Sequence, residues 1–190
     1  MIKSATFLQD YRCFRAGECF NFIPGVNLIV GEQGTGKSTF ISSVVVLTQT
    51  IRVPRFDQLA DTLKIDADNS ELLSFDFERG NPRTQELQSM ESIMGQFMSH
   101  GEFNGKVIAN LESRLAPGTV VLMDEPDMAM SIRSCRKIAE IFKSLVKKYN
   151  CQIIAAVHNF VLIREFPTVL SFEHRRWMKP AEYAKLHMTT

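Results

Sequence analysis

The chain has 190 residues, a size at which a single domain can bury about 70% of its unfolded surface without metal or disulfide support. Apolar residues make up 45% and charged residues 23%, which excludes a disordered chain and a collagen-like repeat, and no apolar run is long enough to cross a bilayer. Because 22 Lys and Arg residues balance 21 Asp and Glu residues, the net charge says nothing about whether the chain has an acidic partner. We therefore expect one domain over residues 1–190.

The amino-terminal residues MIKSATFLQD lack the apolar core and cleavage site of a secretory signal, so we expect a cytoplasmic protein. Four cysteines, at positions 13, 19, 135 and 151, lack the close spacing of a zinc knuckle. In the cytoplasm these cysteines should remain reduced thiols that pack as small apolar residues.

The first part of the chain predicts short strands around one helix. The expected strands are residues 2–9, 18–22, 26–30 and 72–77. A turn at Gly17 joins the first two, and the continuous apolar run VNLIV is typical of a strand buried on both faces. An apolar helix is expected from Ser38 to about Thr50, and residues 51–70 read as irregular and polar.

The second part predicts helices that alternate with buried strands. Helices are expected at residues 84–97, 103–115 and 131–149 and after Pro180, and strands at residues 120–123, 153–157 and 168–172. Ser131 is a candidate cap for the third helix, whose exposed face is basic. Apolar strands alternating with helices predict an α/β fold with a parallel sheet.

A glycine-rich loop is the strongest motif. Residues 31–38 read GEQGTGKS and match G-x-x-x-x-G-K-[ST] at every fixed position, between a predicted strand and a predicted helix. Backbone N–H groups of such a loop, and the helix terminus behind it, bind phosphate oxygens. Lys37 would contact the β- and γ-phosphates, and Ser38 would ligate Mg²⁺. The candidate nucleotide-binding residues here are Gly31, Gln33, Gly34, Thr35, Gly36, Lys37, Ser38 and Thr39.

Two carboxylates follow the predicted strand at residues 120–123. Asp124 and Glu125 would stand at its carboxyl end, where open α/β sheets bind their ligands. Asp124 is suited to holding Mg²⁺, and Glu125 to deprotonating an attacking water molecule. A buried strand that ends in a polar loop would give the same pattern. The functional interpretation of Asp124 and Glu125 therefore depends on the phosphate loop upstream.

Three further segments extend the pattern. Residues 124–131 (DEPDMAMS) resemble the Walker B motif and D-loop of ABC-type ATPases. His158 follows a predicted strand, where that class carries its switch histidine, and Ser99-His100-Gly101-Glu102 precedes a helix, as its signature motif does. The resemblance implies a P-loop NTPase fold, an ABC-type ATPase head with a mostly parallel central sheet and a small amino-terminal antiparallel β element.

Residues near the amino terminus resemble one branch of this class in particular. Residues 10–14 (DYRCF) and 25–31 (GVNLIVG) resemble the opening of the SMC, RecF and OLD-type branch, whose members act mostly on DNA ends, chromosomes or in phage defence. Residues 75–83 and the SHGE signature resemble its small stand-alone ATPases. Only 61 residues separate Lys37 from Ser99, too few for the coiled-coil arm of SMC proteins.

The resemblance implies that two protomers enclose two ATP molecules, with Mg²⁺ at Ser38 and Asp124. Ser99, Gly101 and Glu102 of one copy would contact the nucleotide of the other, and a signature subregion would span about residues 51–115. Lys37, Glu125 and His158 would be the catalytic residues. Arg12 would contact the nucleotide or the dimer interface, and an ordinary surface charge explains it equally well. The chain departs from the class pattern in its SHGE signature, its lack of a clear Q-loop glutamine and its D-loop ending in Ser131.

The leading hypothesis is an ATP-driven switch or motor in DNA repair, recombination or phage-related DNA processing or defence, with DNA or a separate nuclease or effector protein as its partner and no membrane association. A transporter's nucleotide-binding subunit and a low-turnover ATP-binding scaffold are the alternatives. A small-molecule kinase would leave His158 and the signature unexplained. The basic face of the 131–149 helix is explained as well by solvation as by contact with a phosphate backbone.

Overall fold

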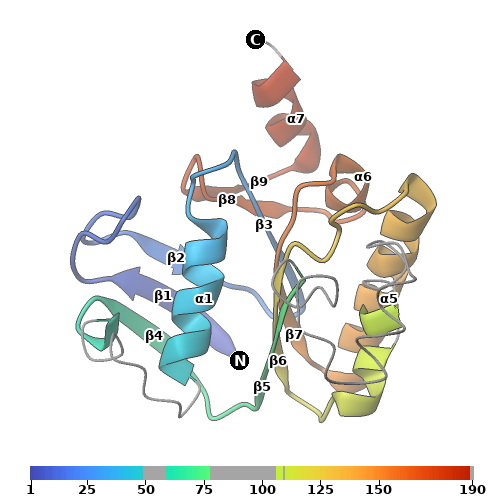
Figure 1. Cartoon of the computed structure of the whole chain (residues 1–190), viewed down its shortest axis with the longest axis horizontal. Helices are drawn as coiled ribbons and strands as arrows, with labels where there is room; N and C mark the ends of the chain where they lie inside the picture. Colours follow the sequence, from blue (N-terminus) through green and yellow to red (C-terminus); the bar gives the residue numbers. More distant parts are fainter. Residues whose placement is uncertain (49–58, 78–105, 109, 189–190) are drawn as a thin grey trace, which may run out of the picture.

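The computed structural model of the chain describes residues 1–48, 59–77, 106–108 and 110–188. Its larger sheet has the strand order β5-β6-β7-β3-β8-β9, and every neighbouring pair is parallel except β8 and β9 (Figure 1). Its strands are β3 (Val26–Val30), β5 (Leu72–Asp76), β6 (Val120–Asp124), β7 (Gln152–Ala156), β8 (Val169–Ser171) and β9 (Arg176–Met178). The predicted α/β class and mostly parallel sheet are confirmed.

A three-stranded antiparallel sheet has the order β2-β1-β4. It contains β1 (Ile2–Phe7), β2 (Cys19–Asn21) and β4 (Leu63–Ala67), which confirms the small amino-terminal β element. The expectation that residues 51–70 are irregular was wrong for β4. Leu63 is buried and Ile65 half-buried between exposed residues, and pairing with β1 stabilises a strand whose local signal is weak.

Helices cover both faces of the larger sheet. α1 (Lys37–Thr48) lies between the two sheets, whereas α5 (Ile132–Tyr149) covers the opposite face (Figure 1). The Ser131 cap is confirmed, because its Oγ accepts a hydrogen bond from Ser134 N at 3.2 Å. The remaining elements are α6 (Phe160–Ile163), α7 (Pro180–Met188) and a 3₁₀ turn (Leu111–Arg114).

The predicted helix at residues 103–115 is described in part. Residues 106–108 and 110 are helical, and the 3₁₀ turn follows them. The helix predicted at residues 84–97 lies outside the described residues. β9 and α6 had no counterpart among the predicted elements, since each is only three or four residues long.

Aromatic side chains join the small sheet to the larger one. The rings of Phe7 and Phe14 stack with centroids 4.1 Å apart, and those of Phe20 and Phe172 with centroids 4.3 Å apart. Phe40 of α1 packs edge-on against Phe172, and all five rings are buried. This cluster fixes the turn between β1 and β2 beside the start of α1, where the predicted phosphate loop ends.

The parallel strands bring their carboxyl ends to one edge of the sheet. β3, β6, β7 and β8 each end there, so the loops after them lie next to one another. The candidate residues at 31–38, 124–125 and 158 lie at the carboxyl ends of these strands or directly after them. Among the helices in the described part of the chain, none is long and apolar enough to span a membrane.

Candidate nucleotide-binding site

The phosphate loop connects β3 to α1, as the sequence predicts. Gly36 has a φ of 97°, which favours glycine, and a Cβ at this position would lie 2.4 Å from Cys13 Sγ and 2.6 Å from Phe14 Cζ. The loop can therefore pack against the turn between β1 and β2 only when residue 36 is glycine. Thr35 Oγ1 donates a hydrogen bond to Glu32 O at 2.8 Å and closes the loop.

Lys37 begins α1, and its buried side chain turns back toward the loop. Its Nζ donates hydrogen bonds to Gly31 O at 2.7 Å and to Glu32 O at 3.1 Å. Burial lowers the pKa of Lys37, and the carboxylates of Glu125 and Asp124 oppose that shift. The ammonium group is thus held by carbonyl oxygens that phosphate oxygens could replace.

Ser38 and Asp124, the two predicted magnesium ligands, lie together although 86 positions separate them. Ser38 Oγ donates a hydrogen bond to Asp124 Oδ1 at 3.1 Å. Asp124 is buried at the end of β6, and Asp76 is its partner in register at the end of β5. Hydroxyl and carboxylate oxygens are the ligands that Mg²⁺ prefers, so the residues present fit this ion.

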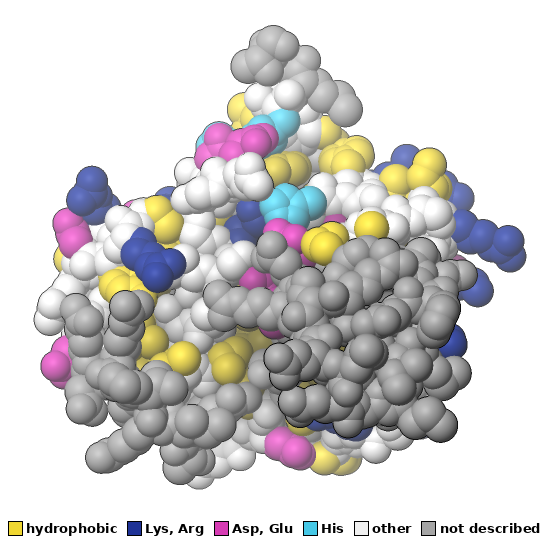
Figure 2. Space-filling model, viewed as in Figure 1, with side chains coloured by type: hydrophobic (Ala, Val, Ile, Leu, Met, Phe, Trp, Pro, Cys, Tyr) yellow, Lys and Arg dark blue, Asp and Glu magenta, His cyan; other side chains and the backbone are white. Residues whose placement is uncertain are grey.

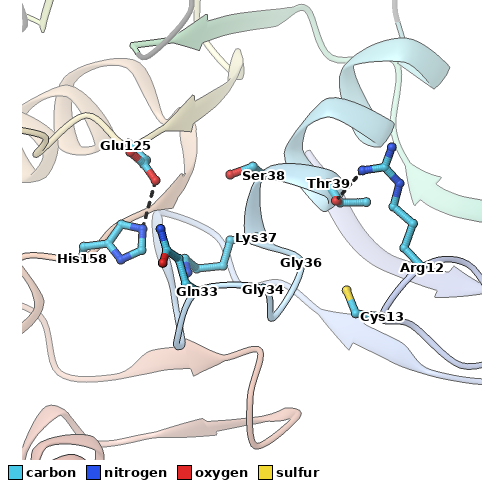
Figure 3. Close-up of a pocket in the computed structure, with 10 residues that line it drawn as sticks. All are labelled: Arg12, Cys13, Gln33, Gly34, Gly36, Lys37, Ser38, Thr39, Glu125 and His158. Atoms are coloured by element: carbon cyan, nitrogen blue, oxygen red, sulfur yellow. Dashed lines mark hydrogen bonds and ion pairs between the residues drawn. The ribbon is translucent and has the colours of Figure 1, made fainter.

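Glu125 and His158 form a pair at the carboxyl ends of β6 and β7. Glu125 Oε1 lies 3.1 Å from His158 Nε2 (Figure 3). Glu125 has a φ of 55°, a left-handed conformation that costs about 1–2 kcal/mol for a residue with a side chain. Its N–H donates to Ala156 O at 3.0 Å, and this contact supports the turn. Such strain at a polar sheet edge points to a functional residue.

Asp127 fixes the backbone of His158, a contact that sequence reasoning missed. Asp127 Oδ2 accepts hydrogen bonds from the N–H groups of His158, at 2.8 Å, and Asn159. Burial raises the pKa of Asp127, although these hydrogen bonds oppose the shift. Asp127 belongs to the D-loop-like segment at residues 124–131, a resemblance that assigns it no role of its own. Its position two residues after Glu125, at the same sheet edge, was the available signal.

Arg12 and Gln33 also line the candidate site, each from a different loop. Arg12 has a φ of 53° in the turn after β1, and its Nη1 donates a hydrogen bond to Thr39 Oγ1 at 3.3 Å. Gln33 and Arg12 line one pocket of about 290 Å³ with the residues described above (Figure 3). The pocket is lined by Arg12, Cys13, Gln33, Gly34, Gly36, Lys37, Ser38, Thr39, Glu125 and His158.

A second hollow adjoins this pocket. It measures about 620 Å³ and shares Gln33, Glu125 and His158 with the first one. Asp127 and Tyr183 line its other parts. The Glu125–His158 pair therefore stands between the loop-side pocket and a larger, open depression.

Arg175 links two turns beside the site and was not singled out from the sequence. Its Nη2 donates to Cys13 O at 2.9 Å, and its Nε lies 3.3 Å from Glu18 Oε2. Its guanidinium also stacks over the rings of Phe14 and Phe20, at 5.1 Å and 5.6 Å from their centroids. Arg175 therefore ties the turn between β8 and β9 to the turn that carries Arg12.

The structure brings together most of the predicted site residues, namely those of the phosphate loop, Arg12, Thr39, Asp124, Glu125 and His158. The predicted signature residues Ser99, Gly101 and Glu102 lie outside the described residues. The four cysteines are free thiols, as expected.

Comparisons with known proteins agree with this fold. A family model described as an AAA domain matches residues 7–91, which is less than half of the chain. No curated protein sequence matches the chain.

Solved structures resemble this chain over nearly its whole length. CbiO1 from Clostridium perfringens, part of the ABC transporter complex cbiONQ, is 14% identical, with a TM-score of 0.57 over 98% of this chain and 92% of that one. A nucleotide-free ATP-binding cassette from an ABC transporter is 13% identical, with a TM-score of 0.57 over 100% and 96% of the two chains. A dimeric cassette in a post-hydrolysis state, bound to ADP and Pi, is 13% identical, with a TM-score of 0.51 over 95% and 99%. The chain therefore has the α/β fold of an ABC-type ATPase head.

Proposed function

We propose that the chain is a Mg²⁺-dependent ATPase that works as an ATP-sandwich homodimer. The observation that carries this proposal is the Glu125–His158 pair, 3.1 Å apart, in the same pocket as Lys37 and Ser38. Hydrolysis of a phosphoanhydride needs a cation for the phosphates, metal ligands and a base for water. The pocket provides candidates for all three, and the ABC-type fold supports the assignment.

Hydrolysis would proceed by in-line attack of water on the γ-phosphorus. Glu125, the general base, takes a proton as the water oxygen bonds to phosphorus, while the bond to the β–γ bridging oxygen breaks and ADP leaves. His158 orients the water and donates a hydrogen bond to the γ-phosphate. Lys37 exchanges its carbonyl partners for phosphate oxygens. Mg²⁺, held by Ser38 and Asp124, would neutralise phosphate charge.

A second copy would complete each site. The open depression beside Glu125 and His158 provides room for the segment of the partner that contacts the γ-phosphate. We assign that segment to Ser99, Gly101 and Glu102 of the opposite chain, within one ATPase unit of residues 1–190 and a signature subregion of about residues 51–115. In the described part of that range, residues 59–77 provide β4 and β5.

A role on DNA is the finer part of the proposal. The DYRCF segment at residues 10–14 supports the SMC, RecF and OLD-type branch, and DNA or a separate nuclease or effector would be the partner. Arg136 and Lys143 on the basic face of α5 lie 3.8 Å and 4.0 Å from the carboxylate of Glu165. Lys148 pairs with Glu112, so part of the positive charge of that face is neutralised within the chain.

A transporter's nucleotide-binding subunit is the second candidate. It is favoured by structural relatives that are themselves parts of ABC transporters. The two functions make different predictions for a pull-down in detergent. A transporter subunit should retain a membrane protein, whereas a DNA-directed ATPase should not, and its turnover should rise when DNA is added.

The Glu125→Gln variant tests the ATPase assignment. Removing the base should lower kcat by about 10²–10⁴-fold while ATP binding is retained, because Lys37 and Ser38 are untouched. Trapped ATP should also shift the chain to a dimer in sedimentation analysis. Glu140→Gln, an exposed change on α5, is the matched control and should hydrolyse ATP at the parental rate.

Three results separate the alternatives. A Glu125→Gln variant that hydrolyses ATP normally would refute the catalytic assignment. A variant that binds ATP but stays monomeric would refute the sandwich dimer. A parental chain that binds ATP and turns over slowly, with or without DNA, would instead indicate an ATP-binding scaffold.

A further inference from the structure

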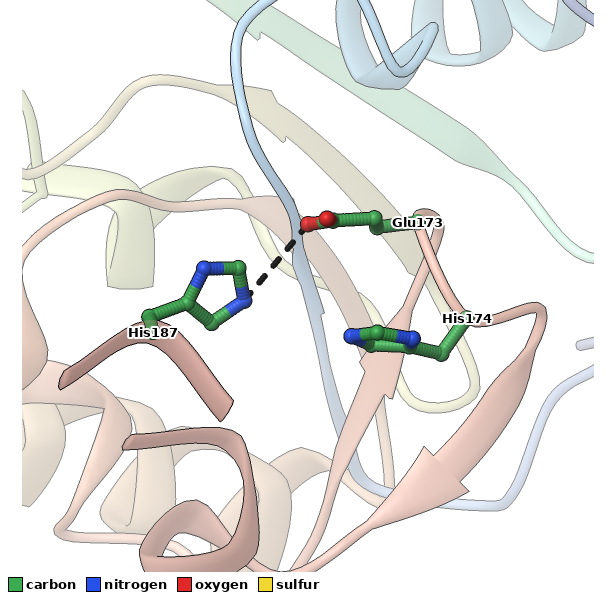
Figure 4. A group of neighbouring side chains, drawn as sticks. All are labelled: Glu173, His174 and His187. Carbon is green, nitrogen blue, oxygen red and sulfur yellow. Dashed lines mark ion pairs between the residues drawn. The ribbon is translucent and has the colours of Figure 1, made fainter. Parts of the chain in front are cut away.

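A second group of histidine and carboxylate side chains lies beneath α7, outside the nucleotide pocket. It consists of Glu173 and His174, in the turn between β8 and β9, and His187 of α7 (Figure 4). One ligand atom from each of these side chains lies within 4.8 Å of the other two. Two imidazole nitrogens and a carboxylate oxygen at this separation are a typical donor set for a d-block cation.

The imidazole nitrogens at the centre of this group have no hydrogen-bond partners. The Nε2 atoms of His174 and His187 are buried from solvent, and neither forms a hydrogen bond with any described part of the chain. His187 Nε2 faces Glu173 Oε2 at 3.5 Å. A buried nitrogen without a partner costs about 1–3 kcal/mol, so two of them in one place call for a ligand that satisfies both.

Glu32 of the phosphate loop orients His187. Its Oε1 lies 3.1 Å from Nδ1 of His187, the ring nitrogen on the far side from Glu173. When Nδ1 donates its proton to this carboxylate, the Nε2 lone pair is free to face Glu173 and His174. A carboxylate that holds the second nitrogen of a ligating histidine is the usual outer shell of a metal site.

From this geometry we propose that Glu173, His174 and His187 bind one Zn²⁺ ion, with Glu32 as the carboxylate that positions His187. Mg²⁺ is not the ion for this site, because it prefers oxygen ligands in octahedral geometry. Ligand atoms around tetrahedral zinc lie roughly 3.4 Å apart. His187 Nε2 and Glu173 Oε2 already have about this separation, at 3.5 Å, so binding would mainly bring His174 closer to these two side chains. Three protein ligands leave the fourth position to water.

Zinc at this site would fasten α7 to the body of the molecule. Glu173 and His174 come from the turn after β8, while His187 is near the carboxyl end of α7. Glu32 extends the connection to the phosphate loop. The ion would therefore order the carboxyl-terminal helix and restrain the loop that precedes Lys37.

The test is zinc titration of the full chain against a chromogenic chelator, with Mg²⁺ present in excess. We expect one bound Zn²⁺ per chain, and at least ~100-fold weaker binding after His174→Ala or His187→Ala, since each removes a ligand. Glu32→Gln should weaken binding by about 10–100-fold, as for other outer-shell carboxylates. Hydrogen exchange of residues 180–188 should slow when zinc is added to the parental chain and not to the His187→Ala variant.

Controls separate this site from other zinc-binding groups. His158→Ala removes the histidine of the nucleotide pocket, and Cys13→Ser with Cys19→Ser removes the two accessible thiols; both variants should bind zinc as the parent does. Thermal unfolding without zinc verifies that each variant is folded. The proposal is overturned if the parent binds no zinc, if binding survives both histidine substitutions in folded protein, or if it depends on the thiols.

Discussion

Glutamate and histidine side chains meet at two places on the face that carries the phosphate loop. Figure 2 shows acidic and histidine side chains together beneath α7 and again lower on the same face. In the nucleotide pocket, Glu125 and His158 contact each other at 3.1 Å. Beneath α7, Glu32 holds the Nδ1 side of His187, and the Nε2 side faces Glu173.

This difference shows how the same residue types can be assigned to different chemistry. A glutamate that pairs with a histidine beside a lysine and a serine–aspartate pair is placed to accept a proton from water. A histidine whose outer nitrogen is held by a carboxylate presents its other nitrogen to a third group, as a metal ligand does. The partner of each ring nitrogen, rather than the composition of the cluster, separates a hydrolytic pair from a metal site.

The variant His158→Ala is expected to have the largest effect, and it tests whether the two clusters act independently. In the proposed mechanism His158 orients water and the γ-phosphate, so its loss should lower kcat about 10²-fold, with a small change in ATP affinity. Zinc affinity should not change, since the two clusters share no residue. Single-turnover hydrolysis and equilibrium binding of ATP measure the two quantities separately. If the His158→Ala variant hydrolysed ATP normally, His158 would have no role in the mechanism. If the variant lost zinc binding, the two clusters would not be independent sites.

Much of the fold could be predicted because its signals are local. The buried strands at residues 26–30 and 120–124 are apolar apart from Asn27 and Asp124, Ser131 caps its helix, and the phosphate loop is recognised by the spacing of its residues. β4 was missed because its stability comes from pairing with β1, which no local pattern reveals.

The site residues also divide into those with a local sequence signal and those placed by long-range contacts. Lys37, Asp124 and Glu125 belong to short motifs, so residue type and spacing predict them as candidates. Asp127 and Arg175 act through backbone groups of other loops, and those contacts exist only after the strands are ordered in the sheet. The pairing of Glu32 with His187 joins residues 155 positions apart, and the sequence holds no signal for it.

Asp127→Ala should have a smaller effect than His158→Ala. It leaves the partly buried N–H groups of His158 and Asn159 without their acceptor and lets the His158 backbone move. We expect kcat to fall about tenfold with KM nearly unchanged, since Asp127 positions the histidine without contacting ATP. Asp127→Asn, which keeps an acceptor oxygen, should restore most of the rate. Equal losses in both variants would argue against a positioning role.

The pH dependence of stability provides the smallest and most specific test of Asp127. Burial raises its pKa above the ordinary value of 3.8, so the folded chain binds a proton more tightly than the unfolded chain does. The stabilisation from this proton is complete below the unfolded pKa and is lost as the pH rises through the folded pKa. The free energy of unfolding of the parent should therefore fall, relative to Asp127→Asn, as the pH rises from about 4 toward neutrality. Denaturant titrations of both proteins at several pH values measure the difference. A constant difference would mean that the carboxylate of Asp127 is ionised as readily in the folded chain as in the unfolded one, and that its hydrogen bonds to the His158 loop fully offset its burial.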